Sequence, residues 1–423
     1  LVEHMQRDVF DDGAHYEVTP GYHAWVMNLF LRAALLAQRN GYEVPGLLEK
    51  HERMFEFLLH LSRPNRHAPS LGDAGGPAGP SLRGSMGLGA LLYDRPDMRY
   101  LGVDKPEESW LWLFGEEAVA RYAAMERRPP AFTSSYLPNA LYFALRTGWE
   151  PEDHYLLFDC APWGGGHSHA DRLSVSAYAL GQDLVIDPGM YSYDEPLSRT
   201  YLRFGPAHNV LLIDEADQPN VDPVALARDF TEGFDFVCGR LTDEKRGLTQ
   251  TRSVLFVRPA YWVIADHVQG EGPHRLQQLF HLPLGAAVGL SEARAEVTLK
   301  EGTSFVLQAA GPPGVTGKVL EGWVPTGGAS AEKAPVVAFE WHADLPTACA
   351  ALLYPLNDTR ADEVRIETTP SAGQALTVAV TRPAAADTLT FAAEPAPLPG
   401  ADAPTRATCV SEREAGRVVY AAP

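Results

Sequence analysis

Residues 163–171 read WGGGHSHAD and join two stretches of strand-like sequence. An apolar run at 154–160 precedes them, and residues 173–180 alternate apolar and polar side chains, as half-buried strands do. The glycines let the backbone bend sharply or approach a ligand closely. Wherever this turn is extended, His167 and His169 point to the same side. The segment therefore predicts a sheet edge that presents two imidazoles.

An aspartate and a third histidine follow within about forty residues. Asp187 ends the strand-like run 183–186, and His208 lies in the sequence Ala-His-Asn. Histidine and carboxylate side chains are zinc ligands, so this set supplies a zinc site with one imidazole to spare. The alternative is that all four are ordinary residues of turns and core edges. The residues alone leave both interpretations open.

The hydrophobic period changes once, near residue 130. Apolar residues recur at three- and four-residue steps over 22–38, 45–61 and 107–125, which predicts helices there. Residues 71–89 are rich in Gly and Pro and predict a loop. The expected apolar side of the first helix consists of Trp25, Val26, Leu29, Phe30, Ala33, Leu36 and Ala37.

Beyond Phe132 the chain consists of short β-type runs separated by turn residues. We predict strands at 140–146, 155–160, 210–213, 254–257, 261–265, 336–341 and 376–380. The Ala- and Pro-rich stretch 384–407 predicts surface loop, and 417–420 an edge strand. The expected fold class is α+β and multidomain, with a helical domain at 1–130 and a large antiparallel β-sandwich at 131–423.

Composition excludes several classes of protein. The 423 residues carry a formal net charge of −19, which argues against a binder of nucleic acid or anionic membranes. No apolar run reaches the roughly 18 residues of a membrane span, and no signal peptide is visible. The four cysteines are far apart and indicate neither a disulfide framework nor a thiolate site. Because the chain starts at Leu1 without Met, we expect upstream residues, including a targeting segment.

A second cluster of reactive side chains lies at residues 11–23, DDGAHYEVTPGYH. Asp-Gly and Pro-Gly turns lead into a helix that starts near Tyr22. A tyrosine and a histidine at a helix start can face a cleft, so Tyr22 and His23 are candidate site residues. The alternative is that Tyr22 packs under the loop and His23 is a solvated helix residue.

These two clusters resemble the motifs of the heparinase II/III family of polysaccharide lyases, which includes heparinases and oligoalginate lyases. The first is Asp12-Gly13 through Glu17 to Tyr22-His23, similar to the pattern DGxxxExSxxYH. The second comprises Gly165 to Asp171, Asp187-Pro188-Gly189, Tyr191, Tyr201, Arg203 and Ala207-His208-Asn209. The resemblance implies an (α/α) toroid against an antiparallel β-sandwich, with an anionic polysaccharide between them. The helices predicted here are too few to close a toroid, so we expect an incomplete one.

The resemblance also implies roles for individual residues. Tyr22 and His167 would be catalytic, and His169, Asp187 and His208 would bind a structural Zn²⁺. Removing the C5 proton of a uronate and expelling the O4-linked sugar requires a base, an acid and neutralisation of the carboxylate. The expected substrate-binding residues are His23, Trp163, Tyr191, Arg199 and Arg203, the arginines because guanidinium pairs bidentately with carboxylate or sulfate. For each arginine, a surface or structural ion pair is the alternative.

Other functions fit the same residues. A uronate C5 epimerase of the dermatan sulfate type would share the site and return the proton to the opposite face. A non-catalytic carbohydrate-binding or scaffold protein would keep only the structural zinc. A metal-dependent hydrolase would need a base near the metal, for which Asp171 is the nearby candidate. The family resemblance further suggests a secreted or periplasmic location and allows a homodimer.

Overall fold

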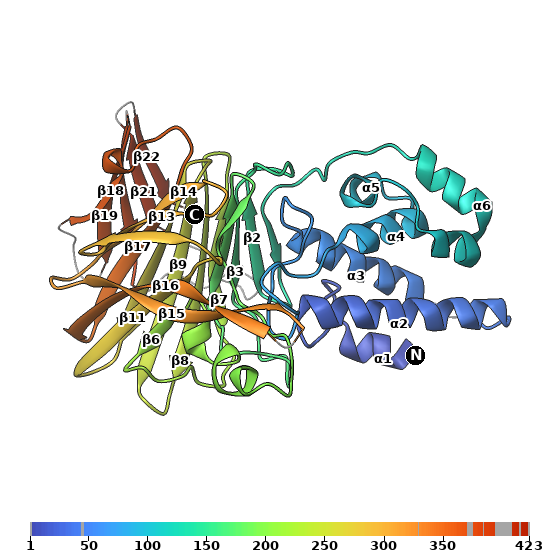
Figure 1. Cartoon of the computed structure of the whole chain (residues 1–423), viewed down its shortest axis with the longest axis horizontal. Helices are drawn as coiled ribbons and strands as arrows, with labels where there is room; N and C mark the ends of the chain where they lie inside the picture. The colour runs from blue at the N-terminus through green and yellow to red at the C-terminus, as the bar shows by residue number, and fades with distance from the viewer. Residues whose placement is uncertain are drawn as a thin grey trace.

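The structure, a computed structural model, describes residues 2–43, 46–328, 330–369, 375–383, 385–393, 408–413 and 416–421. Helices occupy one end of the molecule and antiparallel sheets the remainder (Figure 1). The helices are α1 (Val2–Asp8), α2 (Pro20–Arg39), α3 (Leu47–Leu61), α4 (Arg83–Tyr93), α5 (Pro96–Leu101) and α6 (Glu108–Ala124). The predicted α+β architecture, helices first and sheets after, is confirmed. The last helix and the first strand lie on either side of the expected boundary near residue 130.

Four sheets follow the helices, and a separate hairpin ends the described chain. In spatial order, the five-stranded sheet contains β1 (Ser135–Leu137), β2 (Tyr142–Arg146), β3 (Tyr155–Asp159), β4 (Val175–Ala179) and β5 (Gln182–Val185). The eight-stranded sheet contains β12 (Ala287–Ser291), β13 (Arg294–Thr298), β14 (Ser304–Ala310), β17 (Thr347–Leu356), β10 (Tyr261–Gln269), β9 (Leu248–Val257), β8 (Phe234–Asp243) and β7 (Val224–Phe230). The four-stranded sheet contains β15 (Thr316–Gly327), β16 (Ser330–Asp344), β11 (Pro273–His281) and β6 (Leu211–Ile213). The rest are β18 (Arg365–Thr369), β19 (Leu376–Arg382) and β20 (Ala385–Phe391), and the hairpin β21 (Thr408–Arg413) with β22 (Gly416–Ala421).

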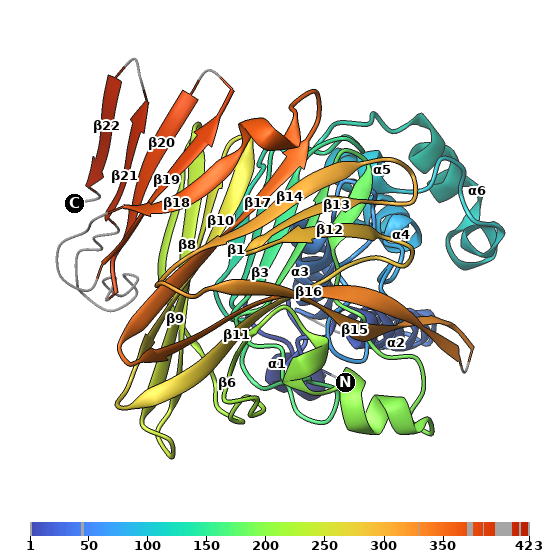
Figure 2. The same ribbon diagram turned by 60° about the vertical axis from the view of Figure 1, so that its left-hand side comes forward.

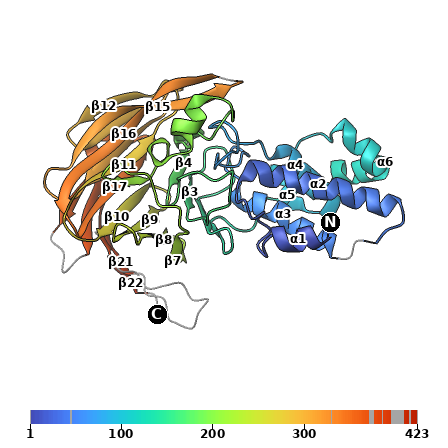
Figure 3. The ribbon, with the colours of Figure 1, turned by 90° about the horizontal axis from the view of Figure 1, so that it is seen from below.

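The five-stranded sheet is buried on both faces. On β2, Phe143 and Leu145 belong to the sandwich core, whereas Tyr142 and Ala144 belong to the core shared with the helices. Strands covered on both faces read as continuous apolar runs, which explains the sequence of β2. Seen from below, β3 and β4 lie between the helices and the outer sheets (Figure 3). This sheet therefore joins the two parts of the molecule.

The sandwich core lies between the eight-stranded sheet on one side and the five- and four-stranded sheets on the other. A further core joins the opposite face of the eight-stranded sheet to β18–β20, which form an outer layer (Figure 2). Every predicted strand has a counterpart. The stretch 384–407 was predicted to be loop. Residues 385–391 of it form strand β20, whereas 384 and 394–407 lie outside the described residues.

Helices α4 and α5 were missed. Residues 71–89 were predicted as loop because of their glycines, yet α4 begins at Arg83. Two of these glycines are packing positions: a Cβ at Gly87 would lie 2.7 Å from the Trp110 ring, and one at Gly89 would lie 2.7 Å from Met98 Sδ. The absence of a side chain lets the helices approach closely, so burial outweighs the low helix propensity of glycine.

The predicted apolar face of α2 is partly wrong. Its buried residues are Pro20, His23, Met27, Phe30, Leu31 and Ala34. Trp25, Leu29 and Leu36 are exposed by 60%, 43% and 66%. The helix carries apolar residues on most of its circumference, and the described elements cover only one side. Pro45, the predicted start of the next helix, lies outside the described residues.

Buried hydrogen bonds hold the helical part on the five-stranded sheet. The Tyr142 hydroxyl donates to the Val18 carbonyl at 2.6 Å, and the Tyr155 hydroxyl donates to the Leu61 carbonyl at 2.9 Å. The second bond satisfies the carbonyl of the last residue of α3, which has no partner within its own helix. The first bond joins the loop before α2 to a strand, and the second joins the end of α3 to a strand.

Replacing Tyr155 by Phe is expected to destabilise the protein by about 1–3 kcal/mol, because the buried Leu61 carbonyl loses its donor. Urea unfolding followed by circular dichroism measures this. Tyr42→Phe is the matched control, since Tyr42 is 70% exposed, and it should change stability by less than about 0.5 kcal/mol. Equal stabilities of the two variants would contradict the prediction.

Candidate active site and metal centre

The two residues predicted to be catalytic lie in contact. Tyr22 is in the first turn of α2, and His167 is in the glycine-rich turn between β3 and β4. Their rings stack with centroids 3.7 Å apart and planes 11° from parallel. Both side chains are half-buried, so they remain open to a ligand. One residue comes from the helical part and the other from the sheet part.

Glu17 fixes the orientation of His167. Its Oε1 lies 2.9 Å from His167 Nδ1, and its Oε2 lies 3.5 Å from His15 Nδ1. A carboxylate only accepts hydrogen bonds, so Nδ1 of His167 donates to it, and in the neutral ring Nε2 keeps a lone pair. Glu17 belongs to the first sequence motif, but the motif alone assigned it no role.

The Tyr22 hydroxyl belongs to a chain of hydrogen bonds. It lies 2.5 Å from the Tyr193 hydroxyl, which donates to Asp73 Oδ2 at 3.0 Å. The other oxygen of Asp73, Oδ1, lies 2.8 Å from Nε2 of His169. Burial, with the hydrogen bonds to Tyr22 and Asp73, raises the pKa of Tyr193 far above its usual value. Neither Tyr193 nor Asp73 was predicted.

Asp73 reaches the site because its loop passes very close to the histidine turn. Gly72 has a φ of +55°, and a Cβ there would lie 2.4 Å from the His167 carbonyl oxygen. The next residue, Asp73, donates its backbone N–H to that oxygen at 3.1 Å. Only glycine allows this approach without displacing backbone. The one signal in the sequence was an isolated carboxylate among glycines.

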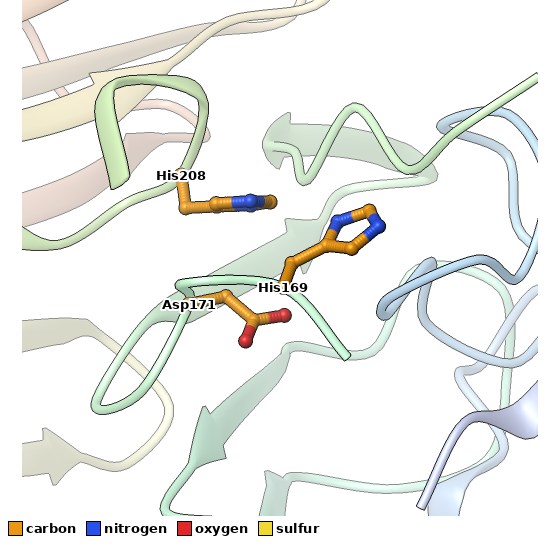
Figure 4. A group of neighbouring side chains, drawn as sticks. All are labelled: His169, Asp171 and His208. Carbon is orange, nitrogen blue, oxygen red and sulfur yellow. The ribbon is translucent and has the colours of Figure 1, made fainter. Parts of the chain in front are cut away.

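Three buried side chains could hold a metal ion. Ligand atoms of His169, Asp171 and His208 all lie within 4.8 Å of one another. Figure 4 shows His169 and Asp171 on one loop and His208 on another. Among the described residues, His169 Nδ1 and His208 Nε2 have no hydrogen-bond partner, although both atoms are buried. Unpaired imidazole nitrogens beside a carboxylate fit the donor set of a zinc site.

The opposite nitrogens of both rings are held by carboxylates. Asp73 binds Nε2 of His169, and Asp187 Oδ2 lies 2.7 Å from Nδ1 of His208. Metal-ligating histidines usually donate their second N–H to a carboxylate in this way, which orients the ring. Burial alone would lower the pKa of His208, but Asp187 outweighs it and raises the pKa to about 9.

The carboxylate of this group differs from the predicted one. We expected Asp187 to join His169 and His208 as a ligand, whereas Asp171 lies in the group and Asp187 lies behind His208. Asp187 also accepts the Gly189 N–H at 2.9 Å. Direct metal binding by Asp187 stays a prediction. Asp171 follows His169 by two residues on the same loop (Figure 4).

A small cavity adjoins the metal group and is acidic. Its polar lining includes Glu17, Asp159, Asp171 and Arg172. Burial, together with the neighbouring Asp171, raises the pKa of Asp159 well above its usual value.

The predicted substrate-binding arginines have structural contacts. Arg203 donates to the carbonyls of Gly166 and Ser168, which braces the histidine turn. Arg199 donates through Nε to the Tyr193 carbonyl at 2.8 Å and lies 3.7 Å from Asp194, in an exposed ion pair.

Two aromatic residues were also expected to bind substrate. Trp163 is 39% exposed and carries the Arg172 guanidinium 4.8 Å above its ring. Tyr191 is half-buried and lies two residues before Tyr193. Substrate binding by these two residues and by both arginines stays a prediction.

The prediction that His23 binds substrate is wrong. Its side chain is fully buried against Phe57, Nδ1 accepts the His15 backbone N–H at 3.1 Å, and Nε2 donates to the Met54 carbonyl at 2.8 Å. The next position on a helix points about 100° away, so Tyr22 faces the site while His23 faces the core. The alternative of a solvated histidine is also wrong.

Two models of known protein families match most of this chain. A family model described as Heparinase II/III-like, C-terminal matches residues 129–367, more than half of the chain, and one described as Heparinase II/III N-terminus matches residues 1–83. The chain belongs to the heparinase II/III family. It is similar to a heparin-sulfate lyase of Bacteroides stercoris, 24% identical over 75% of this chain and 46% of that protein. Another, of Pedobacter heparinus, is 23% identical over 72% and 45%.

Solved structures of the family share the fold. A mutant of heparan sulfate lyase HepC from Pedobacter heparinus superimposes with a TM-score of 0.78 at 20% identity, over 93% of this chain and 61% of that one. A crystal structure of heparinase III superimposes with a TM-score of 0.79 at 16% identity, over 94% of this chain and 62% of that one. The heparinase II/III chain described here spans about half the length of the curated relatives it matches. No helix within its described ranges is long and apolar enough to cross a membrane.

Burial of His23 predicts a pH dependence of stability. Burial lowers the pKa of His23 to about 3, whereas unfolded histidine has a pKa of about 6.5. The unfolded state therefore binds the proton first, and stability falls as pH drops below about 6.5. By pH 5 this residue alone should account for about 2 kcal/mol. Urea unfolding at pH 7.5 and 5 should show a smaller loss in His23→Gln than in wild type; equal losses would contradict the assignment.

Proposed function

We propose that this protein is a polysaccharide lyase that cleaves a uronic-acid-containing polysaccharide by β-elimination. The observation that carries the proposal is the stacked pair of Tyr22 and His167, with Glu17 bound to Nδ1 of the imidazole. The pair offers a phenolic hydroxyl and an imidazole lone pair at one half-buried place, where a proton can be taken and given. The names of the curated relatives, heparin-sulfate lyases, support the same chemistry.

In the proposed reaction the proton on C5 of the uronate is removed, a C4=C5 double bond forms, and the C4–O4 bond breaks. The departing sugar oxygen takes up a proton. Tyr22 would transfer protons at these two atoms, and the lone pair of His167 Nε2 would assist it. The substrate carboxylate must be neutralised while charge develops at C5, and the candidate cations are Arg199, which binds the Tyr193 carbonyl, and Arg203, which binds the Gly166 carbonyl beside His167. Both could turn toward a ligand, because each is bound only by backbone carbonyls or an exposed carboxylate.

The proposed cofactor is a structural zinc ion bound by His169, His208 and Asp171. Bound there, it would join the loop of His169 to the loop of His208 and so brace the wall that carries His167. Because Asp171 belongs to the group of potential ligands, it is not free to act as the base of a metal-dependent hydrolase. The metal therefore supports the lyase reaction by holding structure.

The lyase proposal predicts that the protein produces unsaturated uronate from at least one member of a panel containing heparan sulfate, heparin, dermatan sulfate and alginate. Ultraviolet absorbance of the new double bond measures it. Tyr22→Phe should lower kcat at least about 100-fold, since general acid–base catalysis contributes that much or more. Tyr42→Phe, far from the pair, should retain activity.

A folded protein that forms no unsaturated product on the whole panel would contradict the proposal. Exchange of the C5 proton with solvent deuterium, without chain cleavage, would identify an epimerase instead. Binding of the polymers without either reaction would identify a carbohydrate-binding protein. The expected secreted or periplasmic location and the homodimer remain predictions.

The metal proposal predicts one zinc ion per chain. His169→Ala should abolish stoichiometric zinc, measured by elemental analysis after gel filtration. Asp171→Asn and Asp187→Asn separate the two candidate carboxylates: loss of a ligand should weaken binding more than loss of an outer carboxylate, which typically costs about 10–100-fold in affinity. Absence of metal from wild type, or unchanged content in His169→Ala, would contradict the assignment.

A further inference from the structure

A continuous set of hydrogen bonds connects the proposed metal centre to the proposed catalytic tyrosine. It runs from His169 Nε2 to Asp73, from Asp73 to the Tyr193 hydroxyl, and from there to the Tyr22 hydroxyl. We infer that Asp73 and Tyr193 are positioning residues, which couple the metal-binding site to the orientation of Tyr22. This inference rests on the proposed function. A metal described as structural would then also affect the chemical step.

The acceptors determine the direction of every bond in the chain. Asp73 can only accept, so both His169 Nε2 and the Tyr193 hydroxyl donate their protons to it. With its proton directed to Asp73, the Tyr193 oxygen is left to accept, and Tyr22 donates. The remaining lone pairs of the Tyr22 oxygen then face away from Tyr193. The Asp73 carboxylate thus sets the orientation of the Tyr22 hydroxyl, which lies two hydrogen bonds away from it.

The metal acts on the other end of this chain. Nδ1 of His169 is the unpaired nitrogen of the ring, and an ion bound there leaves Nε2 to carry the proton. That is the tautomer that donates to Asp73. Without an ion, Nδ1 is buried with no partner, so the ring can turn away from Asp73 to find one. The Asp73 side chain is 1% exposed, so water cannot easily replace the lost donor.

The Tyr193 hydroxyl would not be left as an unsatisfied buried group if its two hydrogen bonds were lost. Tyr193 is 47% exposed, and an exposed hydroxyl can bond to water. Its ring is nevertheless held between Tyr22 and Asp73, and Arg199 binds its backbone carbonyl. A phenylalanine at this position should therefore fold with little loss of stability, which makes the hydroxyl testable by itself.

The first test is kinetic. Tyr193→Phe should lower kcat about 10–100-fold with KM changed less than about threefold, as expected when a reacting group is slightly misplaced. Tyr42→Phe is the matched control. The zinc-free wild type, prepared with a chelator, should show a comparable loss in kcat, and zinc-free Tyr193→Phe should lose little more, because both changes break one chain. Independent, multiplicative losses would overturn the coupling.

The second test does not use activity. Coupling is reciprocal, so loss of the Tyr193 hydroxyl should weaken zinc binding about fivefold or more, measured by competition with a chromogenic chelator. Asp73→Asn should weaken it further, by about 10–100-fold. Unchanged zinc affinity in Tyr193→Phe relative to Tyr42→Phe would overturn the inference. If wild type forms no product on any polyuronide, the proposed function fails while this measurement still decides the coupling.

Discussion

Buried carboxylates need hydrogen-bond donors, and this requirement organises the site. Asp73 and Asp187 are each almost fully enclosed, and each accepts from the imidazole of a histidine. An unpaired carboxylate at either place would be costly, so the two rings are held in one orientation. Their other nitrogens point to a common space beside Asp171. The position of the metal group is therefore set by Asp73 and Asp187, which lie outside the group and pair with its two histidines.

His167 and His169 lie in one short segment, yet they pair with different carboxylates and so have different roles. His169 turns inward to Asp73, whereas His167, two residues earlier, turns outward to Tyr22 and Glu17. In a strand these side chains would point to the same side. The segment is instead a tight turn, closed by the Ser168 N–H to the Gly165 carbonyl at 3.2 Å. The glycines that precede the histidines thus allow neighbouring imidazoles to occupy different environments.

Much of the fold was predictable because burial on one or two faces leaves a local pattern. The runs at 155–160 and 261–265 are recognisable as strands from composition alone. Tyr22, His167, His169 and His208 were found because a motif preserves their spacing. Asp73 was not, since its role depends on a loop that approaches the histidine turn through Gly72, a contact between residues far apart in the chain.

The errors have a similar origin. His23 was placed at the site with Tyr22, yet consecutive helix positions point in different directions, and only the packing against Phe57 shows which one faces the core. Helix α4 was missed because its glycines favoured a loop, whereas Gly87 and Gly89 let the helix pack closely against Trp110 and Met98. For the metal group we predicted Asp187, and Asp171 is the carboxylate that lies with both histidines; direct binding by Asp187 stays a prediction.

The division of the proposed catalytic pair between two parts of the molecule affects how the protein would fail. Tyr22 and Glu17 belong to the helical part and His167 to the sheet part, so the stacked pair exists only while the two remain docked. A shift of a few tenths of a nanometre between them would separate the rings and leave the sandwich core intact. Loss of the pair thus requires only that the helical part open from the five-stranded sheet, so the core that the two parts share governs the stability of the site.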